Sequence, residues 1–379
     1  MKPATNKLIY LESLRGLASL LVVLVHIKMA FFPDFAFATN YLAAFAVRLF
    51  FLLSGFVLSV AYFRKRQDSV LISAALRRYP RLMIPVFASV MFAWLLLACH
   101  AYRNLDVAAL AHQPAHSFLS ESFRHESSVG QALFEGAIGT FFHFNPTTTL
   151  NPNLWTMPIE LAGSFFVFAL LATGKWIRLR VALYLVLGGI LLFVLRRAES
   201  VFMFDFLVGV ALCDFYVRWE NTHEREEISP WLSVSLNIAG IIIGFESATW
   251  AASNLRLHTP GYSNLPTLAS LLIVGGAAFS SHLQNALEHP VISFLGRLSF
   301  PLYLFHHAII CSAGCGFYLL LANSGLPVLT VALLASVFSL VIAVLFAWGA
   351  YYAVELTAIW TGRKVATLIM QPFGGATKR

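Results

Sequence analysis

Several ionisable side chains of this sequence lie inside long apolar segments. Placing one charge at the centre of a bilayer costs at least about 2.5–3.5 kcal/mol on insertion scales, so each is a candidate functional residue. Arg15 and His26 are eleven residues apart in one such segment. At 100° per residue they share a helix face, about 16 Å apart along the axis. A packed histidine beside an arginine that sets topology would show the same spacing, and the pair alone does not decide between the two.

A second group of arginines lies in the segment RRYPRL at 77–82. We expect Arg78 and Arg81 to share a face where the third apolar helix begins, with Pro80 fixing the turn. Guanidinium groups offer forked donors that match phosphate oxygens, and a helix N-terminus would add to the attraction. The pair would then hold a polyphosphate ligand that arrives from the cytoplasm. Topology alone explains the same residues.

The segment LWTMPIE at 154–160 leads from a polar stretch into the fourth expected helix. Glu160, just inside that helix on the outer side, is a candidate for contact with a proton carrier. It could also be a partner of the helix dipole with no chemistry of its own. Trp155 could contact a substrate or lie in the aromatic belt at the membrane interface.

The segment GRLSFPLYLFHH at 296–307 places Ser299, Tyr303 and His306 at positions i, i+4 and i+7 of one helix face. His306 lies ten residues beyond Gly296, which puts it about 15 Å along the helix, a depth similar to that of His26. Two histidines at one depth on different helices suggest a shared polar chamber, although helix-packing histidines would look similar.

The remaining ionisable residues inside apolar segments are interpreted as structural ion pairs. Arg48 has no obvious partner within its own helix and therefore needs one from another helix. The others of this group are Asp205, Asp214 and Glu355.

The composition places these segments in a membrane. The chain has 379 residues, of which 59% are hydrophobic and 12% charged, whereas soluble domains carry roughly 25% charged residues. Its mean hydropathy is +0.74. These values exclude a disordered polymer and a coiled coil, and the long apolar runs exclude an outer-membrane barrel. The net charge of +8 comes from short basic stretches between apolar runs, which indicates topology and no nucleic-acid partner. The four cysteines, without CxxC spacing, predict neither a disulfide framework nor a metal site.

The apolar runs predict an all-α polytopic bundle of about ten transmembrane helices. With the N-terminus inside, 19 Lys and Arg fall in inner segments and six in outer ones, so both termini are expected in the cytoplasm. We expect one transmembrane domain over residues 1–379, multi-pass in the plasma (inner) membrane. It would include an outer loop at 102–153 with a re-entrant or interfacial helix, and a short cytoplasmic tail at 356–379. The expected spans are 14–32, 41–63, 82–101, 156–174, 181–195, 201–217, 232–248, 266–282, 299–321 and 328–352.

Five segments in this order resemble the acyltransferase 3 family of integral membrane acyltransferases. They are LESLRGLASLLVVLVH at 11–26, RLFFLLSGFVLS at 48–59, RRYPRL at 77–82, LWTMPIE at 154–160 and GRLSFPLYLFHH at 296–307. The resemblance covers residues 8 to 355 and implies a membrane O-acyltransferase. Such an enzyme passes an acyl group, usually acetyl, from cytoplasmic acyl-CoA to a hydroxyl of a carbohydrate or related acceptor.

Carried onto this sequence, the resemblance matches Arg15 and His26 to the family's Arg and His element, and Arg78 and Arg81 to its paired arginines. Both elements are implicated in donor handling or catalysis. The sequence departs from the common pattern at Glu12 and Arg48, where many members carry Asp. Some relatives carry an appended SGNH hydrolase-like domain; this chain ends soon after its last helix, which implies transfer by one component.

The chemistry requires a base for the hydroxyl proton, donors for the oxyanion and an anchor for the donor's phosphates. We expect His26 to be the base, with Glu160 orienting it or stabilising the imidazolium, and His306 is the alternative base. A covalent acyl-histidine intermediate is also open. The expected substrate contacts are Arg15, Arg78, Arg81, Trp155, Ser299 and Tyr303, with acyl-CoA and a carbohydrate or glycolipid acceptor as substrates and no metal.

Two other function classes compete with this interpretation. A proton-coupled secondary transporter could use the same Arg, His and Glu residues as a proton relay and substrate site, but no repeated half with paired broken helices is evident in the sequence. An assembly partner without catalysis leaves the buried charges without a purpose. The sequence does not indicate an oligomeric state.

Overall fold

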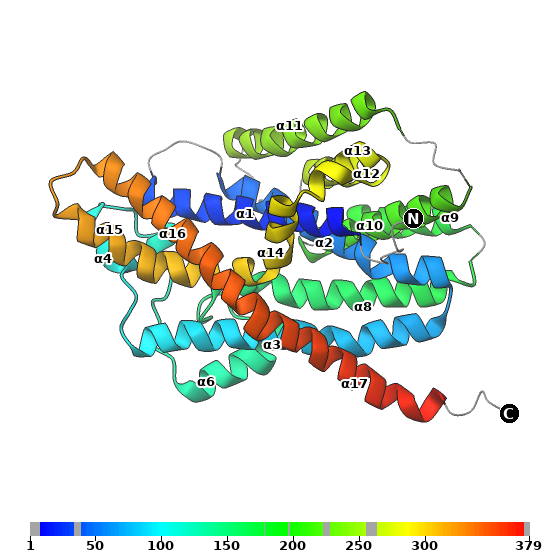
Figure 1. Ribbon diagram of the computed structural model, residues 1–379, viewed down its shortest axis with the longest axis horizontal. Coiled ribbons are helices and arrows are strands. Elements are labelled where there is room, and N and C mark those ends of the chain that lie inside the picture. Colours follow the sequence, from blue (N-terminus) through cyan, green and yellow to red (C-terminus); the bar gives the residue numbers. More distant parts are fainter. Residues whose placement is uncertain are drawn as a thin grey trace.

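The computed structural model describes residues 8–33, 39–177, 179–195, 198–222, 228–254 and 264–374, and every regular element in these residues is a helix. Most of the long helices lie side by side along one axis, and α16 and α17 cross them obliquely (Figure 1). Within lipid a backbone has no water to bind, so an apolar chain of this kind satisfies its amides and carbonyls within helices. The predicted all-α polytopic architecture is confirmed.

Among the described residues, seven continuous helical segments are long and apolar enough to cross a membrane, and α12 with α13, bent by 99°, is an eighth if the pair forms one broken span. Two shorter apolar helical segments, at 180–195 and 230–246, complete the set. All ten predicted spans overlap described helices, although the span 82–101 runs past the end of α3 at Ala98 and the span 266–282 includes the break between α12 and α13. Ten crossings remain a prediction. The helices that form the bundle are α1 (Ile9–Phe31), α2 (Thr39–Lys65), α3 (Asp68–Ala98), α8 (Thr156–Gly174), α9 (Arg180–Gly189) with η3 (Ile190–Leu195), α10 (Ala198–Thr222), α11 (Pro230–Asn254), α12 (Leu265–Ala278), α13 (Ser281–Leu287), α14 (Pro290–Ile309), η4 (Ile310–Gly314), α15 (Cys315–Ala322), α16 (Val328–Ala350), η5 (Tyr351–Glu355) and α17 (Leu356–Gly374).

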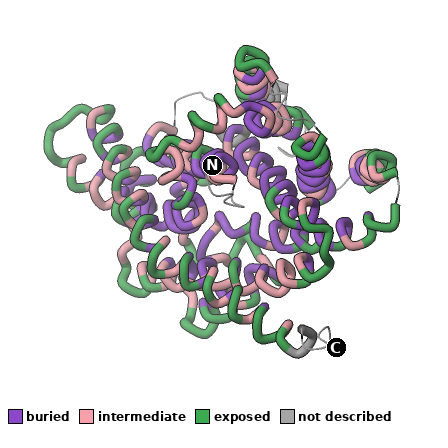
Figure 2. Tube along the Cα trace, turned by 45° about the vertical axis from the view of Figure 1, so that its right-hand side comes forward, coloured by how far each residue is buried: buried purple, intermediate pink, exposed green. Residues whose placement is uncertain are grey.

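Buried residues gather inside the bundle and exposed ones on its outside (Figure 2). On α16 the exposed side chains are themselves apolar, at Leu333, Val337, Val341 and Leu345, four residues apart along one face. An apolar stripe of this length would be unfavourable in water and suits acyl chains. The outer surface of the bundle therefore fits a lipid environment.

The first helix is held against α14 and α2. At the crossing with α14, a Cβ on Gly16 would lie 2.4 Å from the backbone nitrogen of Gly296, so the two backbones touch there. Only a residue without a side chain permits this approach, as is usual at helix contacts in membranes. The glycine contact fixes the register of the two helices that carry His26 and His306.

Buried ion pairs join the second helix to its neighbours. Arg48 of α2 pairs with Asp205 of α10 and bonds to the hydroxyl of Thr267 on α12. The prediction that Arg48 finds its partner on another helix is confirmed. Asp214, also predicted to be paired, contacts Arg180 and Arg218 at 2.9 and 2.8 Å.

The third helix differs from the prediction at its beginning. It begins at Asp68, so Arg78 lies about three turns inside it, and Pro80 and Pro85 are helix-internal. Prolines are tolerated within membrane helices because neighbouring groups satisfy the freed backbone. The expected helix start at Arg78 is therefore wrong, and no helix N-terminus is available there to attract phosphate.

A segment of short helices, predicted to lie on the outer side, follows α3. It comprises α4 (Asn104–Leu110), α5 (Phe118–Glu121), α6 (Val129–Phe134), η1 (Glu135–Gly139), α7 (Thr140–Phe142) and η2 (Pro152–Trp155). The run 129–142 lies along α3: the indole of Trp94 donates to Ser127, whereas the hydroxyl of Tyr79, fifteen positions earlier, donates to Ala137. These contacts support a re-entrant helix, which remains a prediction.

At the other end of the chain, the expected tail at 356–379 is helical as far as Gly374. There α17 continues α16 through η5 and packs against α3. Residues 375–379 lie outside the described part of the chain, and the cytoplasmic location of the tail remains a prediction.

Candidate active site

The two predicted histidines meet. Nδ1 of His26 on α1 lies 2.8 Å from Nε2 of His306 on α14, and their rings stack with centroids 5.0 Å apart. The two histidines are 280 residues apart in the sequence, and so are Ser19 and Ser299, whose hydroxyl and carbonyl form a 2.9 Å hydrogen bond between the same two helices. The register of α1 against α14 therefore brings the histidines together. The expectation that His26 and His306 lie together is therefore met, and the polar chamber around them remains a prediction.

The hydrogen bonds of this pair assign its tautomers. Nδ1 of His306 lies 2.9 Å from the carbonyl oxygen of Leu302, which can only accept, so this nitrogen carries the proton. Nε2 of the neutral His306 ring is then an acceptor, and Nδ1 of His26 must donate to it. No described residue bonds to Nε2 of His26, which is left with a lone pair. This is the nitrogen a general base would use.

A third histidine extends the cluster. His307 is buried, and its Nδ1 lies 3.2 Å from the side-chain oxygen of Asn153 while its Nε2 lies 2.7 Å from the hydroxyl of Ser122. The amide nitrogen of Asn153 is 3.5 Å from Nε2 of His306. Asn153 thus connects the two adjacent histidines of α14. Sequence reasoning missed His307, Asn153 and Ser122, although the pair of histidines at 306–307 was visible in the sequence.

The chain before α8 holds Asn153 in place through contacts with α14. Tyr303 donates from its hydroxyl to the carbonyl of Asn153 at 2.7 Å and lies 2.9 Å from the hydroxyl of Thr156. Asn151 donates to the carbonyl of Leu304 at 2.8 Å. Tyr303, predicted as a substrate contact, therefore contacts the segment that positions Asn153.

A cap from the outer segment covers the histidines. Phe118, the first residue of α5, stacks on His26 with ring centroids 5.0 Å apart and on His307 at 4.4 Å. The cap is also attached to α1, since the amide of Gln113 donates to the carbonyl of Ala30 at 2.8 Å. We call residues 104–124 the outer cap.

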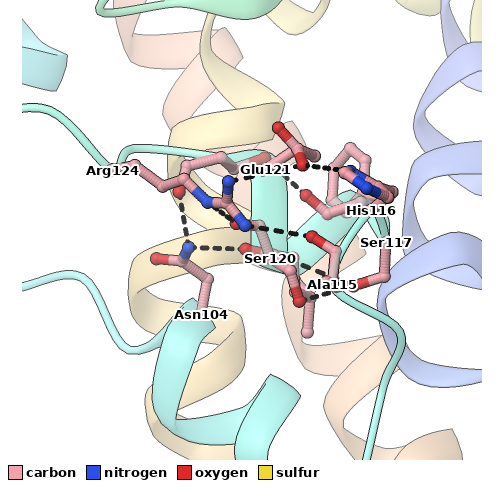
Figure 3. A network of polar contacts seen from close by, with 10 residues as sticks. Asn104, Ala115, His116, Ser117, Ser120, Glu121 and Arg124 are labelled. Carbon is pink, nitrogen blue, oxygen red and sulfur yellow. Dashed lines mark hydrogen bonds and ion pairs between the residues drawn. The ribbon is translucent and has the colours of Figure 1, made fainter.

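The outer cap is held together by its own polar contacts (Figure 3). Asn104 donates to the carbonyls of Leu119 and Ser122 at 2.8 and 2.7 Å, and Ser117 caps the start of α5. Arg124 donates to the carbonyls of Ser120 and Ala115. These contacts fix the short helix that presents Phe118 to the histidines.

A second cluster contains the predicted donor-binding arginines. Arg78 is buried, pairs with the carboxylate of Glu160 and donates to the hydroxyl of Ser164 at 2.6 Å. The same carboxylate oxygen accepts from Ser54 at 2.7 Å. No hydrogen bond joins Glu160 to His26 in the described residues. Glu160 contacts Arg78 and not His26, so the structure does not support the expectation that Glu160 orients His26.

Two further arginines lie near Arg78. Arg15 and Arg81 lie close enough to Arg78 to repel its charge. Neither has a hydrogen bond or an ion pair with any described residue. Three guanidinium groups and one carboxylate therefore lie within electrostatic range of Arg78 or belong to its ion pair, and the net positive charge would attract an anion.

Two predicted substrate contacts, Trp155 and Ser299, have no side-chain hydrogen bond to either cluster in the described residues. Trp155 is 38% exposed, and its ring packs against Phe202 at 5.8 Å. Ser299 offers its carbonyl to Ser19 and is otherwise buried. Within the described residues, no group of three or more His, Cys, Asp or Glu is arranged to hold a metal ion.

Comparison with known proteins decides the family of this site. Residues 8–351 match the acyltransferase domain of the acyltransferase 3 family. The chain belongs to that family. The O-acetyltransferase PaAT-1 of Phomopsis amygdali is 23% identical over 368 residues, which cover 80% of this chain and 72% of that protein. No solved structure matches this acyltransferase 3 chain. The resemblance read from five motifs is confirmed, and family membership favours acyl transfer over transport.

Proposed function

We propose that this protein is an O-acyltransferase that moves an acetyl group from cytoplasmic acetyl-CoA to a hydroxyl of a carbohydrate or glycolipid acceptor. The observation that carries the proposal is the placement of Arg15 and His26 on one helix. Arg15 belongs to the arginine cluster with Arg78. His26, eleven residues after Arg15 on the same helix, bonds to His306. One helix thus connects an anion-binding cluster to a candidate base.

The arginine cluster supports phosphate binding. Arg81 is exposed and has no partner among the described residues, so its donors are available to a ligand. Arg78 is committed to Glu160 and contributes mainly by its charge and by holding the helices together. The diphosphate of CoA would then lie at Arg81 and Arg15, with the thioester extended toward the histidines.

The histidine pair supports proton transfer. In the proposed reaction Nε2 of His26 takes the proton of the acceptor hydroxyl, and the oxygen attacks the thioester carbonyl. The tetrahedral intermediate then collapses, the C–S bond breaks, and the imidazolium returns its proton to the departing CoA sulfur. Nε2 of His306 accepts the Nδ1 proton of His26, so that the neutral His26 ring keeps its lone pair on Nε2.

The outer cap supports an acceptor on the outer side. Phe118 covers the histidines from the segment predicted to lie outside, whereas the arginines lie toward the start of α3, predicted to lie inside. The acceptor would approach beneath the cap. This arrangement agrees with an inner membrane location and with modification of a surface polysaccharide or lipid-linked sugar.

Transfer by the purified protein tests the proposal. The full chain in phospholipid nanodiscs is supplied with radiolabelled acetyl-CoA, and free CoA release is measured with and without candidate sugars. Sugar-dependent CoA release that stops in His26→Gln supports the enzyme. Counter-transport of protons or sugars across proteoliposomes without CoA release would contradict it. Mass spectrometry of surface glycans with and without the gene then identifies the acceptor by the lost acetyl mass.

A further inference from the structure

A cationic groove lies between α3 and α17, away from the histidines. It has a volume of about 470 Å³, and its polar lining consists of Ser73 and Arg77 of α3 and of Arg363, Thr367 and Gln371 of α17. The two helices approach closely beside it, since a Cβ on Gly362 would lie 3.2 Å from the carbonyl oxygen of Arg77. The groove is thus built from two packed helices.

The arginines of the groove have guanidinium N–H groups without a partner among the described residues. Arg77 donates from Nε to the carbonyl of Ser73 at 3.0 Å, which leaves its two terminal nitrogens without a described partner. Arg81 and Arg363 both lie within electrostatic range of Arg77. None of the three forms an ion pair with a described carboxylate. Like charges held together by packing favour the binding of an anion.

This charge is continuous with the arginine cluster of the site. Arg81 lies within electrostatic range of both Arg77 and Arg78, and Arg15 lies within range of Arg78. Five arginines therefore lead from the surface groove to the interior. Among the described residues, Glu160 is the carboxylate that pairs with any of them.

Acyl-CoA has a matching distribution of charge. Its adenosine end carries a 3′-phosphate and a diphosphate, and its thioester lies at the far end of an uncharged arm. We propose that the groove between α3 and α17 binds the 3′-phosphorylated adenosine end of the donor. This inference rests on the acyl-CoA dependence proposed above. It assigns donor binding to α17, which no motif had singled out.

The same groove chemistry suits the phosphate of an anionic lipid, because the groove is open to the surface. Continuity with Arg78 and Arg15 favours the donor. A lipid headgroup bound at Arg363 would not require the buried Arg78 or the half-buried Arg15 further inside. The experiment separates the two sources by lipid composition.

The test compares acetyl-CoA with 3′-dephospho-acetyl-CoA as donors for the full chain in phosphatidylcholine nanodiscs. The wild-type protein should prefer acetyl-CoA by about tenfold in KM, the usual effect of one charge-assisted contact. Arg363→Gln should lose most of that preference, and Arg77→Gln should reduce it. The matched control is Lys364→Gln, because Lys364 is a neighbouring cation whose ammonium lies over the ring of Trp360, outside the groove. It should keep the preference.

Several results would overturn the inference. A wild-type protein indifferent to the 3′-phosphate, or an Arg363→Gln variant with its preference intact, removes the subsite while leaving acetyl-CoA as donor. If Arg363→Gln and Lys364→Gln lose the preference for acetyl-CoA equally, the preference comes from the overall positive charge of this region and the groove is not a binding site. An effect of Arg363→Gln that appears only when phosphatidylglycerol is added assigns the groove to lipid. Absence of any transfer from acetyl-CoA refutes the proposed function and this inference together.

Discussion

Gly16 of α1 touches Gly296 of α14 ten residues before the point where His26 of α1 meets His306 of α14. Both helices advance by 1.5 Å per residue, so a contact that aligns the glycines also aligns the histidines. The bond between Ser19 and the carbonyl of Ser299 lies between the two contacts in the same register. The geometry of the histidine pair therefore depends on a backbone contact about 15 Å away.

Gly16→Ala should impair transfer without touching the chemistry. The added methyl group would lie 2.4 Å from the nitrogen of Gly296, so the helices must separate and the histidines shift. A displacement near 1 Å lowers the transfer rate by about 100-fold. The measurement is kcat in nanodiscs, with Gly349→Ala as control, since nothing lies within 4 Å of a Cβ there. Normal kcat in Gly16→Ala would refute the role of the register.

Arg78 and Arg81 should separate stability from donor binding. Arg78→Ala leaves Glu160 buried without its partner, which should lower the free energy of unfolding by about 3–5 kcal/mol. Arg81→Ala removes an exposed side chain and should change that free energy by less than about 0.5 kcal/mol while weakening acetyl-CoA binding. Thermal unfolding and titration calorimetry measure the two effects.

Two further variants check this separation. Adding Glu160→Gln to Arg78→Ala should restore part of the lost stability, because the uncompensated charge is removed. Arg81→Lys should bind the donor less well than the wild type and better than Arg81→Ala, because an ammonium lacks the forked donors. Unchanged acetyl-CoA affinity in Arg81→Ala would return this arginine to a topological role.

Phe118 should shield the histidines from reagents on the outer side. Phe118→Ala removes the ring that stacks on both His26 and His307, so carbethoxylation of these histidines by diethyl pyrocarbonate should become faster. Peptide mass spectrometry reports the modified residue. Phe134→Ala, at an exposed position of α6, is the control and should leave the rate unchanged. Equal rates in both variants would show that the outer cap does not cover the site.

Single-cysteine labelling tests the orientation. In a background without the four native cysteines, Gln67→Cys should react with a membrane-impermeant thiol reagent only in inside-out vesicles. His116→Cys, at a side chain that is 93% exposed in the outer cap, should react only in right-side-out vesicles. Labelling of position 67 from outside would invert the assignment of donor and acceptor sides.

Helix periodicity accounts for what could be predicted. The common depth of His26 and His306 follows from the rise per residue of a helix. The partner of Arg48 was expected on another helix because its own apolar segment offers none. The start of α3 was misplaced because Pro80 was taken as a boundary, whereas lipid-buried helices accommodate proline. Asn153, Ser122 and Phe118 were missed because they lie in irregular outer segments, whose return into the bundle no periodicity indicates. Glu160 was assigned to His26 because the depth of Arg78 within α3 was underestimated.

The rate of acetyl transfer by His26→Gln tests the central claim most directly. Glutamine keeps a similar polar volume but has no titratable nitrogen, so insertion and acetyl-CoA affinity should be unchanged while transfer falls by roughly 10²–10⁴, the usual contribution of a general base. His306→Gln should lower the rate less, because it disturbs the tautomer of His26 and leaves the base in place. If His26→Gln retains most of the wild-type transfer rate, His26 is not the base and the account is contradicted.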